Sequence, residues 1–431
     1  MIVIVGAGLA GLVCARALRA AGREVLVLER ELVPGGRLRT EQHPEGFLLD
    51  RGFQVLFTAY PAARRHLSYS RLTLREFAPG AILARGGRLH AIADPLRARR
   101  YLLASLTNPL FGPLDKLRVL PLALAARRTP LQTIFAQPDV RTEDYLRGRK
   151  LSDRFIDSFV RPFYGGIFLD RALDTSSATF RFTFKMLAEG ETVLPARGIQ
   201  QIPEQLAESL PPDCVRYGVA VESLLFEEGQ VSGLRTDDGE EVAADAMVIA
   251  TDPQAAARLL GDEAIPHQPV ACACAYFASP ISLYPDPLIV LNANPDPYVN
   301  NLVQITNIAP GYAPPGQHLL SLTILGAVPE DDATVEARCR TDLATIFPGK
   351  DLAALRLLRG VRIPFAQFAQ PPGIYARLAA NTTAYPNLFL ASEATASSSI
   401  QGAMASGEAA AGLVLAMAPA PISGQGLGVA G

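Results

Sequence analysis

Three glycines near the N-terminus have the spacing that brings a backbone against phosphate groups. Gly6, Gly8 and Gly11 follow a β-branched run and open a stretch with helical periodicity. The first glycine permits a tight turn, the second lets the backbone approach a pyrophosphate, and the third lets the helix pack on the strand. Glu29 ends the next apolar run, and its carboxylate can accept hydrogen bonds from an adenosine ribose. The pattern predicts a dinucleotide-binding turn with the helix N-terminus facing the phosphates.

Two segments that follow could extend this site. In Pro34-Gly35-Gly36-Arg37 the glycines would let a loop lie flat on a pyrophosphate, while Arg37 adds a permanent charge with a bidentate fork. Downstream, GFLLDRGFQVLF at 46–57 places Asp50-Arg51-Gly52-Phe53 on a short apolar strand and turn.

The C-terminal part of the chain contains an unusual run of small residues. ASSSIQGAMASGEAAAG at 396–412 follows an apolar strand-like stretch and Glu393. Serines at the entry can cap a helix, and a helix N-terminus stabilises a negative charge by roughly 0.3 to 2 kcal/mol. Close helix packing alone would explain the alanines, but it would not explain the acid and the serine cluster. The run therefore indicates a helix whose first turn faces a ligand.

These segments together resemble a known superfamily. GAGLAGL, GGRLRT, LDRGFQ and LFLASEATASSSIQGAMASGEAA are similar to the FAD-binding segments of amine oxidases, phytoene desaturases and protoporphyrinogen oxidases. The resemblance implies that residues 52–54 run beside the isoalloxazine ring and that Val221 brackets the adenine. It also implies that Glu393 lies near the ribityl or pyrophosphate part, and that residues 399–401 offer N–H groups to the N1 and O2 edge of the flavin.

The cofactor is expected to be non-covalent FAD, because no cysteine after Cys339 could form the cysteinyl linkage of monoamine oxidases. The cofactor-binding residues expected on this basis are Gly6, Ala7, Gly8, Leu9, Ala10, Gly11, Glu29, Arg30, Gly35, Gly36, Arg37, Gly52, Phe53, Gln54, Val221, Glu393, Ser399, Ile400 and Gln401.

The fold expected is α/β, with a Rossmann-like FAD-binding domain and an inserted α+β substrate domain that has a mixed sheet and a helical part. A meander with turns at Glu228-Gly229 and Asp238-Gly239, followed by a strand at 246–250, supplies late strands to the first sheet. The FAD-binding domain is therefore discontinuous, over 1–75, 196–260 and 376–418. Segments 76–195, mostly helical, and 261–375, with four strand-like runs that suggest an antiparallel floor, form the substrate domain. Residues 419–431 are expected to be a flexible tail.

Composition excludes several other classes. The net charge of −2 in 431 residues argues against a nucleic-acid partner. The five cysteines lack framework spacing and the five histidines lack a metal-ligand pattern, so we expect a reducing cytoplasm and no metal. No uninterrupted apolar run approaches the length of a membrane span.

The stretch 96–135 combines leucines with basic residues. Its apolar members are Leu102, Leu103, Leu106, Leu110, Phe111, Leu120 and Leu124. Arginines and one lysine accompany them, and Asp115 is the only acid. This pattern is typical of an ordinary amphipathic layer over the substrate domain, or of a surface that meets a membrane or admits an apolar substrate.

The substrate class is less closely defined than the cofactor. RPFYGGIFLDRALDTSSATF at 161–180 resembles a substrate-side segment of protoporphyrinogen oxidases and desaturases, so Arg161, Tyr164 and Lys185 are candidates for substrate contact. No general base is assigned, because dehydrogenation by a flavin can need little more than positioning and desolvation. Amine oxidases of the superfamily usually carry a lysine on a substrate-domain strand, but this chain has none between Lys185 and Lys350.

The leading hypothesis is an FAD-dependent oxidoreductase, cytoplasmic or peripheral on the membrane. It would dehydrogenate a hydrophobic polyene, carotenoid or tetrapyrrole by hydride transfer to flavin N5, with oxygen or a quinone as electron acceptor. The alternatives are an amine oxidase of the monoamine or polyamine type and a redox-inactive FAD-binding protein. A flavin-dependent mutase would need a polar, arginine-lined pocket, whereas the middle of the chain is largely apolar.

Overall fold

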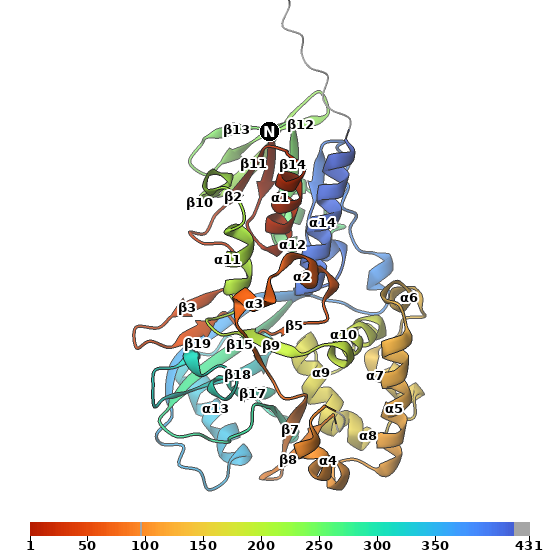
Figure 1. Cartoon of the computed structure of the whole chain (residues 1–431), viewed down its shortest axis with the longest axis vertical. Coiled ribbons are helices and arrows are strands. Elements are labelled where there is room, and N and C mark those ends of the chain that lie inside the picture. Colours follow the sequence, from red (N-terminus) through yellow and green to blue (C-terminus); the bar gives the residue numbers. More distant parts are fainter. Residues whose placement is uncertain (95–96, 418–431) are drawn as a thin grey trace, which may run out of the picture.

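The computed structural model describes residues 1–94 and 97–417, and the tail expected at 419–431 lies outside them. Two sheets form the body of the molecule, and a group of helices packs beside the second (Figure 1). The first is parallel throughout, with the order β10 (Val215–Tyr217), β2 (Val25–Glu29), β1 (Ile2–Val5), β14 (Ala246–Ile249) and β20 (Leu388–Leu390). Strands covered on both faces read as continuous apolar runs, as IVIV of β1 does.

The two faces of the parallel sheet bury different side chains. Ile4 and Val27 point to one face, which packs against α1 (Leu9–Ala20), α11 (Gln201–Ala207) and α14 (Ile400–Ala416). Val5 and Ile249 point to the other face, which packs against α12 (Pro253–Leu260) and the antiparallel meander. The meander consists of β11 (Val221–Glu227), β12 (Gln230–Thr236) and β13 (Glu241–Ala243). Helices α1 and α14 therefore lie together on one side of the sheet.

The second sheet has seven strands and is mixed. Its order is β19 (Arg356–Phe368), β15 (Pro269–Ser279), β18 (His318–Leu325), β17 (Asn301–Gln304), β16 (Ile289–Asn292), β7 (Gly80–Arg85) and β8 (Arg88–Ala93). Strands β16 and β7 pair in parallel, and the other pairs are antiparallel. The expectation of a mostly helical segment 76–195 misses β7 and β8, which form one edge of this sheet.

Short strands and helices complete the molecule. The short strands are β3 (Thr40–Gln42), β4 (Leu48–Asp50), β5 (Leu56–Phe57), β6 (Leu74–Glu76) and β9 (Thr192–Pro195). The remaining helices are α2 (Pro61–His66), α3 (Tyr69–Leu72), α4 (Leu102–Thr107), α5 (Pro113–Arg128), α6 (Leu131–Ala136), α7 (Thr142–Gly148), α8 (Asp153–Phe155), α9 (Arg161–Phe168), α10 (Ser177–Glu189) and α13 (Asp332–Ile346). Helices α4 to α10 form a helical lobe at the lower right of Figure 1.

The fold class expected from the sequence is confirmed: the molecule is α/β, with a parallel sheet and a separate mixed sheet. Strands β1, β14 and β20 come from parts of the chain that are far apart, yet they are neighbours in the parallel sheet. The exact domain limits stay a prediction.

Candidate active site

The turn between β1 and α1 needs each of its glycines for a different reason. Gly6 has φ +108°, and a Cβ there would lie 2.7 Å from the carbonyl oxygen of Ala250. A Cβ on Gly11 would lie 2.0 Å from the carbonyl oxygen of Gly6, so the helix touches the turn. A Cβ on Gly8, by contrast, would meet no protein atom within 4 Å. The backbone at Gly8 therefore faces open space, which is what a ligand approaching the turn requires.

Unused donors surround that open space. The N–H groups of Leu9, Ala10 and Gly11 form the first turn of α1 and have no acceptor among the described residues. The Glu29 carboxylate, which is buried, accepts from the N–H of Ala7 at 2.7 Å and from that of Glu31 at 2.9 Å. Three converging N–H groups and the positive end of the helix dipole are suited to a phosphate.

The second glycine pair closes over this turn. Gly35 donates its N–H to the carbonyl oxygen of Ala7 at 2.9 Å, and both Gly35 (φ +126°) and Gly36 (φ +58°) have left-handed backbones. A Cβ on Gly36 would lie 3.8 Å from the Cα of Gly8. The loop thus lies directly beside the open space at Gly8.

Arg37 is held by the far end of the chain. Its Nη1 donates to Oε1 of Glu393 at 2.7 Å and to the carbonyl oxygen of Ala366 at 2.9 Å. Glu393 is buried and also accepts from the hydroxyl of Ser398 at 3.0 Å. The sequence predicts charge neutralisation of a pyrophosphate by Arg37, and the structure shows that this guanidinium first neutralises a buried carboxylate.

Helix α14 begins with the cap that its sequence predicts. The Ser399 hydroxyl accepts from the N–H of Gly402 at 2.9 Å, and a Cβ on Gly402 would lie 2.0 Å from the carbonyl oxygen of Ser397. The N–H groups of Ile400 and Gln401 have no acceptor among the described residues. The side chain of Gln401 instead accepts from the N–H of Ala62 and fixes this helix to α2. A second helix N-terminus with free donors therefore lies in the molecule.

A buried carboxyl group, that of Asp50 at the end of β4, fixes the start of the segment that follows this strand. Asp50 accepts hydrogen bonds from the Thr40 hydroxyl at 2.6 Å, the Ile199 N–H at 3.1 Å and the Tyr312 hydroxyl at 3.0 Å. Complete burial raises the pKa of the Asp50 carboxyl to about 6. Gly52 has φ +90°, so the chain turns sharply directly after this anchor.

The next residues are held by backbone contacts. Phe53 donates its N–H to Sγ of Cys274 on β15, at 3.2 Å. The Gln54 amide donates to the carbonyl oxygens of Arg37, at 3.0 Å, and Arg51. Segment 52–54 thus bridges the glycine loop and the mixed sheet.

Two of the expected cofactor residues lie farther along the parallel sheet. Val221 is the first residue of β11, and the nearby N–H of Val219 donates to the carbonyl oxygen of Glu29 at 2.9 Å. Arg30 is exposed directly after β2 and lies 3.8 Å from the Glu31 carboxylate. These positions are compatible with an adenosine at the Glu29 end of the site, and the roles of both residues stay predictions.

A narrow pocket of about 40 Å³ lies between the N-terminus of α14 and helix α10. Its lining is aromatic, aliphatic and neutral polar, and no lining residue is charged. The residues are Phe57, Tyr60, Ile167, Phe168, Thr179, Phe182, Thr183, Gln367, Gln370, Tyr375, Ser397, Ser398 and Ser399. The serines connect this pocket to the helix end with free N–H groups, so it is the candidate for the part of the substrate site nearest that helix end.

Hydrogen bonds hold the pocket walls together. Thr179 on α10 and Tyr375 share a hydrogen bond of 2.9 Å between their hydroxyls, and the Gln370 amide oxygen accepts from the N–H of Ser398 at 3.1 Å. Thr179, Phe182 and Thr183 have the i, i+3, i+4 spacing of one helix face. That spacing, within an aromatic-rich helix, is the sequence signal by which these lining residues could have been found.

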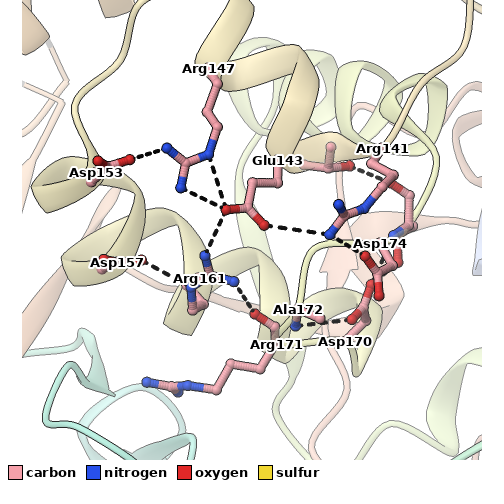
Figure 2. A network of polar contacts seen from close by, with 12 residues as sticks. Arg141, Glu143, Arg147, Asp153, Asp157, Arg161, Asp170, Arg171, Ala172 and Asp174 are labelled. Atoms are coloured by element: carbon pink, nitrogen blue, oxygen red, sulfur yellow. Dashed lines mark hydrogen bonds and ion pairs between the residues drawn. The ribbon is translucent and has the colours of Figure 1, made fainter.

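Of the three substrate candidates, none is among the residues that line this pocket. Arg161 lies in a polar network of the helical lobe, where it bonds the Glu143 carboxylate, the Asp157 carboxylate and the carbonyl oxygen of Arg171 (Figure 2). The network connects α7, α9 and the turn at 170–174. Since the hydrogen bonds of Arg161 go to protein groups, its position favours a structural role.

Tyr164 and Lys185 are also placed differently from the expectation. The Tyr164 ring is buried against Phe168 and Phe180, with ring centroids 4.6 Å apart in the second pair, so it belongs to the core of the lobe. Lys185 donates to the carbonyl oxygen of Ala126 at 2.9 Å and to the Glu189 carboxylate at 2.5 Å. Its ammonium group therefore ties α10 to the end of α5 and does not face the pocket.

Comparison with known proteins identifies the class. The chain matches the model of the flavin containing amine oxidoreductases over residues 9–415, and it therefore belongs to that family. It is 29% identical over 300 residues to a phytoene dehydrogenase of Streptomyces griseus, a match that covers 62% of this chain and 57% of that protein. The chain thus spans little more than half the length of this relative.

Solved structures share the whole fold. An oxidoreductase from Methanosarcina mazei has a TM-score of 0.73 at 21% identity, with 94% of this chain and 98% of that chain covered. A putrescine oxidase bound to putrescine has a TM-score of 0.72 at 19% identity, with 96% and 99% covered. The superfamily resemblance seen in the sequence is confirmed, and FAD is the cofactor of the family.

The residues present fit FAD. The open space at Gly8 and the free N–H groups of α1 suit its pyrophosphate, and the buried carboxylate of Glu29 lies at the place expected for the ribose. The free N–H groups at the start of α14 would face the part of the flavin that becomes negative on reduction. The individual residue assignments stay predictions.

Proposed function

We propose that this protein is an FAD-dependent oxidoreductase that dehydrogenates a hydrophobic substrate of the polyene, carotenoid or tetrapyrrole type. The observation that carries the proposal is the uncharged lining of the pocket beside α14. An ammonium substrate placed there would lose its hydration without meeting a carboxylate, which is costly. An apolar substrate would lose no hydration of that kind, and it would gain contact with Tyr60, Phe168 and Phe182.

The absence of a suitable lysine supports the same proposal. Lys185 is engaged between α5 and α10, and no lysine occurs from there to Lys350, so β15 to β18 carry none. The relative from Streptomyces griseus is a phytoene dehydrogenase, which is consistent with an apolar substrate.

The chain's own residues would position the substrate, stabilise negative charge on the reduced flavin and exclude water from the pocket. When bound, the flavin supplies the two-electron chemistry by accepting a hydride at N5, and oxygen or a quinone would take up the electrons afterwards. The N–H groups of Ile400 and Gln401 would stabilise negative charge at the pyrimidine edge. The aromatic walls would exclude water, and the Thr179–Tyr375 hydrogen bond would keep α10 at a fixed distance from the serine entry.

The test is the visible absorption spectrum of the FAD-loaded protein, recorded anaerobically before and after adding one compound class at a time. Bleaching of the flavin bands by a carotenoid precursor or a porphyrinogen is the expected result. Bleaching by monoamines or diamines would instead identify an amine oxidase. Flavin that only dithionite reduces would identify a redox-inactive FAD-binding protein.

A variant tests the pocket itself. Thr183→Asp places a carboxylate among the lining residues, and we expect it to abolish reduction by the apolar substrate while the flavin bands stay unchanged. Thr341→Asp on the exposed face of α13 is the matched control and should react like the wild type. Equal rates in the two variants would show that the substrate lies elsewhere.

A further inference from the structure

Helices α4 and α5 turn large apolar side chains into solvent. On α4, Leu103 is 73% exposed and Leu106 is 60% exposed, and on α5 Leu117 is 66% exposed. The full set, which we call the leucine face, is Leu102, Leu103, Leu106, Leu114, Leu117, Leu120 and Leu124. Soluble surfaces seldom gather this many apolar side chains without a partner.

The register of α5 is the reverse of an ordinary amphipathic helix. Its leucines at 114, 117 and 124 lie along one face, and that face points outward. Asp115 points inward and accepts from the N–H of Ser152 at 2.9 Å and from its hydroxyl at 2.7 Å. The only acid of the two helices is therefore buried and engaged, while the apolar face is exposed.

The two helices are fixed to each other and form one surface. Lys116 of α5 donates to the carbonyl oxygen of Leu106, the residue that also exposes its side chain on α4. Helix α5 forms the outer right edge of the molecule and α4 lies at its lower end (Figure 1). The leucine face is thus on the periphery, away from the parallel sheet.

Both ends of the leucine face are positively charged. Arg99 and Arg100 precede α4, and Arg127 and Arg128 end α5, and all four are exposed. Arg99, Arg127 and Arg128 have no ion pair among the described residues. An isologous contact with a second copy would bring cations against cations whichever way the helices ran. A lipid surface with anionic headgroups matches both the leucines and the charges.

We propose that the leucine face docks the protein on an anionic membrane surface, with the leucines among the acyl chains and the four arginines at the headgroups. Within residues 1–94 and 97–417 no helix has the length and apolarity to span a bilayer, so the contact is peripheral. Helix α10 joins this face to the pocket, because Lys185 bonds α5 while Thr179, Phe182 and Thr183 line the pocket. This last link rests on the proposed function, since it places the pocket of an apolar substrate on a helix that also supports the leucine face.

The experiment is flotation of the FAD-loaded protein with vesicles of phosphatidylcholine, alone or mixed with phosphatidylglycerol. The wild type should float with the mixed vesicles. Replacing three exposed leucines together, Leu103→Gln, Leu106→Gln and Leu117→Gln, should lower the partition coefficient about tenfold or more. Arg127→Gln with Arg128→Gln should lower it by roughly fivefold for each charge removed, and only with mixed vesicles.

A matched control separates docking from general surface apolarity. Phe226→Gln with Ile281→Gln removes two exposed apolar side chains elsewhere, 43% and 39% exposed, and should float like the wild type. The proposal is overturned if the wild type floats with neither vesicle, if the leucine variant floats equally well, or if the wild type is a dimer that the leucine variant dissociates. Flotation is read without a substrate, so failure of the dehydrogenation assay leaves this result standing.

Discussion

Helices α1 and α14 approach so closely that a Cβ on Gly407 would lie 2.3 Å from the carbonyl oxygen of Ala10, whereas α4 and α5 hold their leucines in solvent. In the first pair small residues are required because another backbone occupies the space beside them. In the second pair large apolar residues lie where the chain offers no neighbour. Both arrangements are unusual for a helix surface, and each has a different physical cause.

The difference between the two helix pairs indicates which positions face a ligand. Neighbouring protein atoms leave no room for a side chain at Gly407 or Gly11, so packing within the chain is enough to require glycine at both positions. Packing within the chain does not account for Gly8, which faces open space, or for Leu117, which faces solvent. Positions of this second kind indicate a partner that is not part of the chain. We infer FAD for the first and lipid for the second.

Substituting two glycines of the turn between β1 and α1 gives the strongest test of this difference. Gly11→Ala should lower the free energy of unfolding by about 2 to 3 kcal/mol or more and remove the flavin, because the new Cβ would overlap the carbonyl oxygen of Gly6. Gly8→Ala should lower the free energy of unfolding of the FAD-free chain by no more than about 1 kcal/mol, the cost of replacing glycine at the N-cap of α1, but weaken FAD binding by about tenfold or more. Urea unfolding and flavin titration measure the two quantities.

If Gly8→Ala instead binds FAD like the wild type, the open space at this glycine does not receive the cofactor. If Gly11→Ala is as stable as the wild type, the contact between helix and turn is not rigid. Either result would contradict the distinction between a glycine required by protein packing and a glycine required by a bound cofactor.

A second comparison lies within α5. Leu122 is 7% exposed and packs in the core of the helical lobe, so Leu122→Ala should cost about 2 to 5 kcal/mol of unfolding free energy. Leu117→Ala, on the exposed face, should change it by less than about 0.5 kcal/mol. Chemical denaturation of both variants checks the prediction. A large loss in Leu117→Ala would show that the leucine face packs against protein.

These contrasts also show which parts of the molecule were predictable. The glycine turn, the meander and the capped start of α14 depend on residues close in sequence, so their patterns could be recognised. Ser399, for example, caps α14 as its position suggests. Of the late strands that the sequence predicts for the first sheet, β14 is found there, whereas the meander β11 to β13 forms a sheet of its own.

The pocket could not be predicted in the same way, because its walls come from five separate stretches of the chain that only the fold brings together. Tyr375 has no local motif, and its partner Thr179 lies far away in sequence. Arg161 and Lys185 each have a local i, i+4 partner, Asp157 and Glu189, which the sequence can suggest. Their distant partners Glu143 and Ala126 are brought to them only by the fold. Charge and aromaticity identify candidates, while burial and partners decide their roles.

The third prediction concerns the anchor beneath segment 52–54. The pKa of Asp50 is raised from 3.8 to about 6, so the folded state holds this proton more tightly than the unfolded state. The contribution of Asp50 to the free energy of unfolding therefore falls as the pH rises from 3.8 to about 6, by roughly 3 kcal/mol in total. Asp50→Asn keeps an oxygen acceptor for Thr40 and Ile199 and can donate its amide N–H to the Tyr312 hydroxyl, so the variant should lack this loss. The free energy of unfolding of variant and wild type, compared from pH 4 to pH 7, measures it.

Asp213→Asn, at an exposed position, is the control for removal of a carboxyl and should follow the wild type at every pH. If Asp50→Asn also follows the wild type, the buried carboxyl is not the group whose ionisation weakens the fold.

The smallest expected effect concerns the ion pair that joins the two ends of the cofactor site. The Arg37 side chain is 34% exposed whereas Glu393 is buried, so the coupling energy of their contact should be about 1 to 2 kcal/mol. A double-mutant cycle with Arg37→Gln and Glu393→Gln measures this coupling, once for unfolding of the FAD-free chain and once for FAD affinity. If Arg37 serves only Glu393, the double variant should regain most of the affinity lost by either single variant. If the guanidinium also reaches the pyrophosphate, every variant that lacks Arg37 should bind FAD weakly, whatever residue stands at 393.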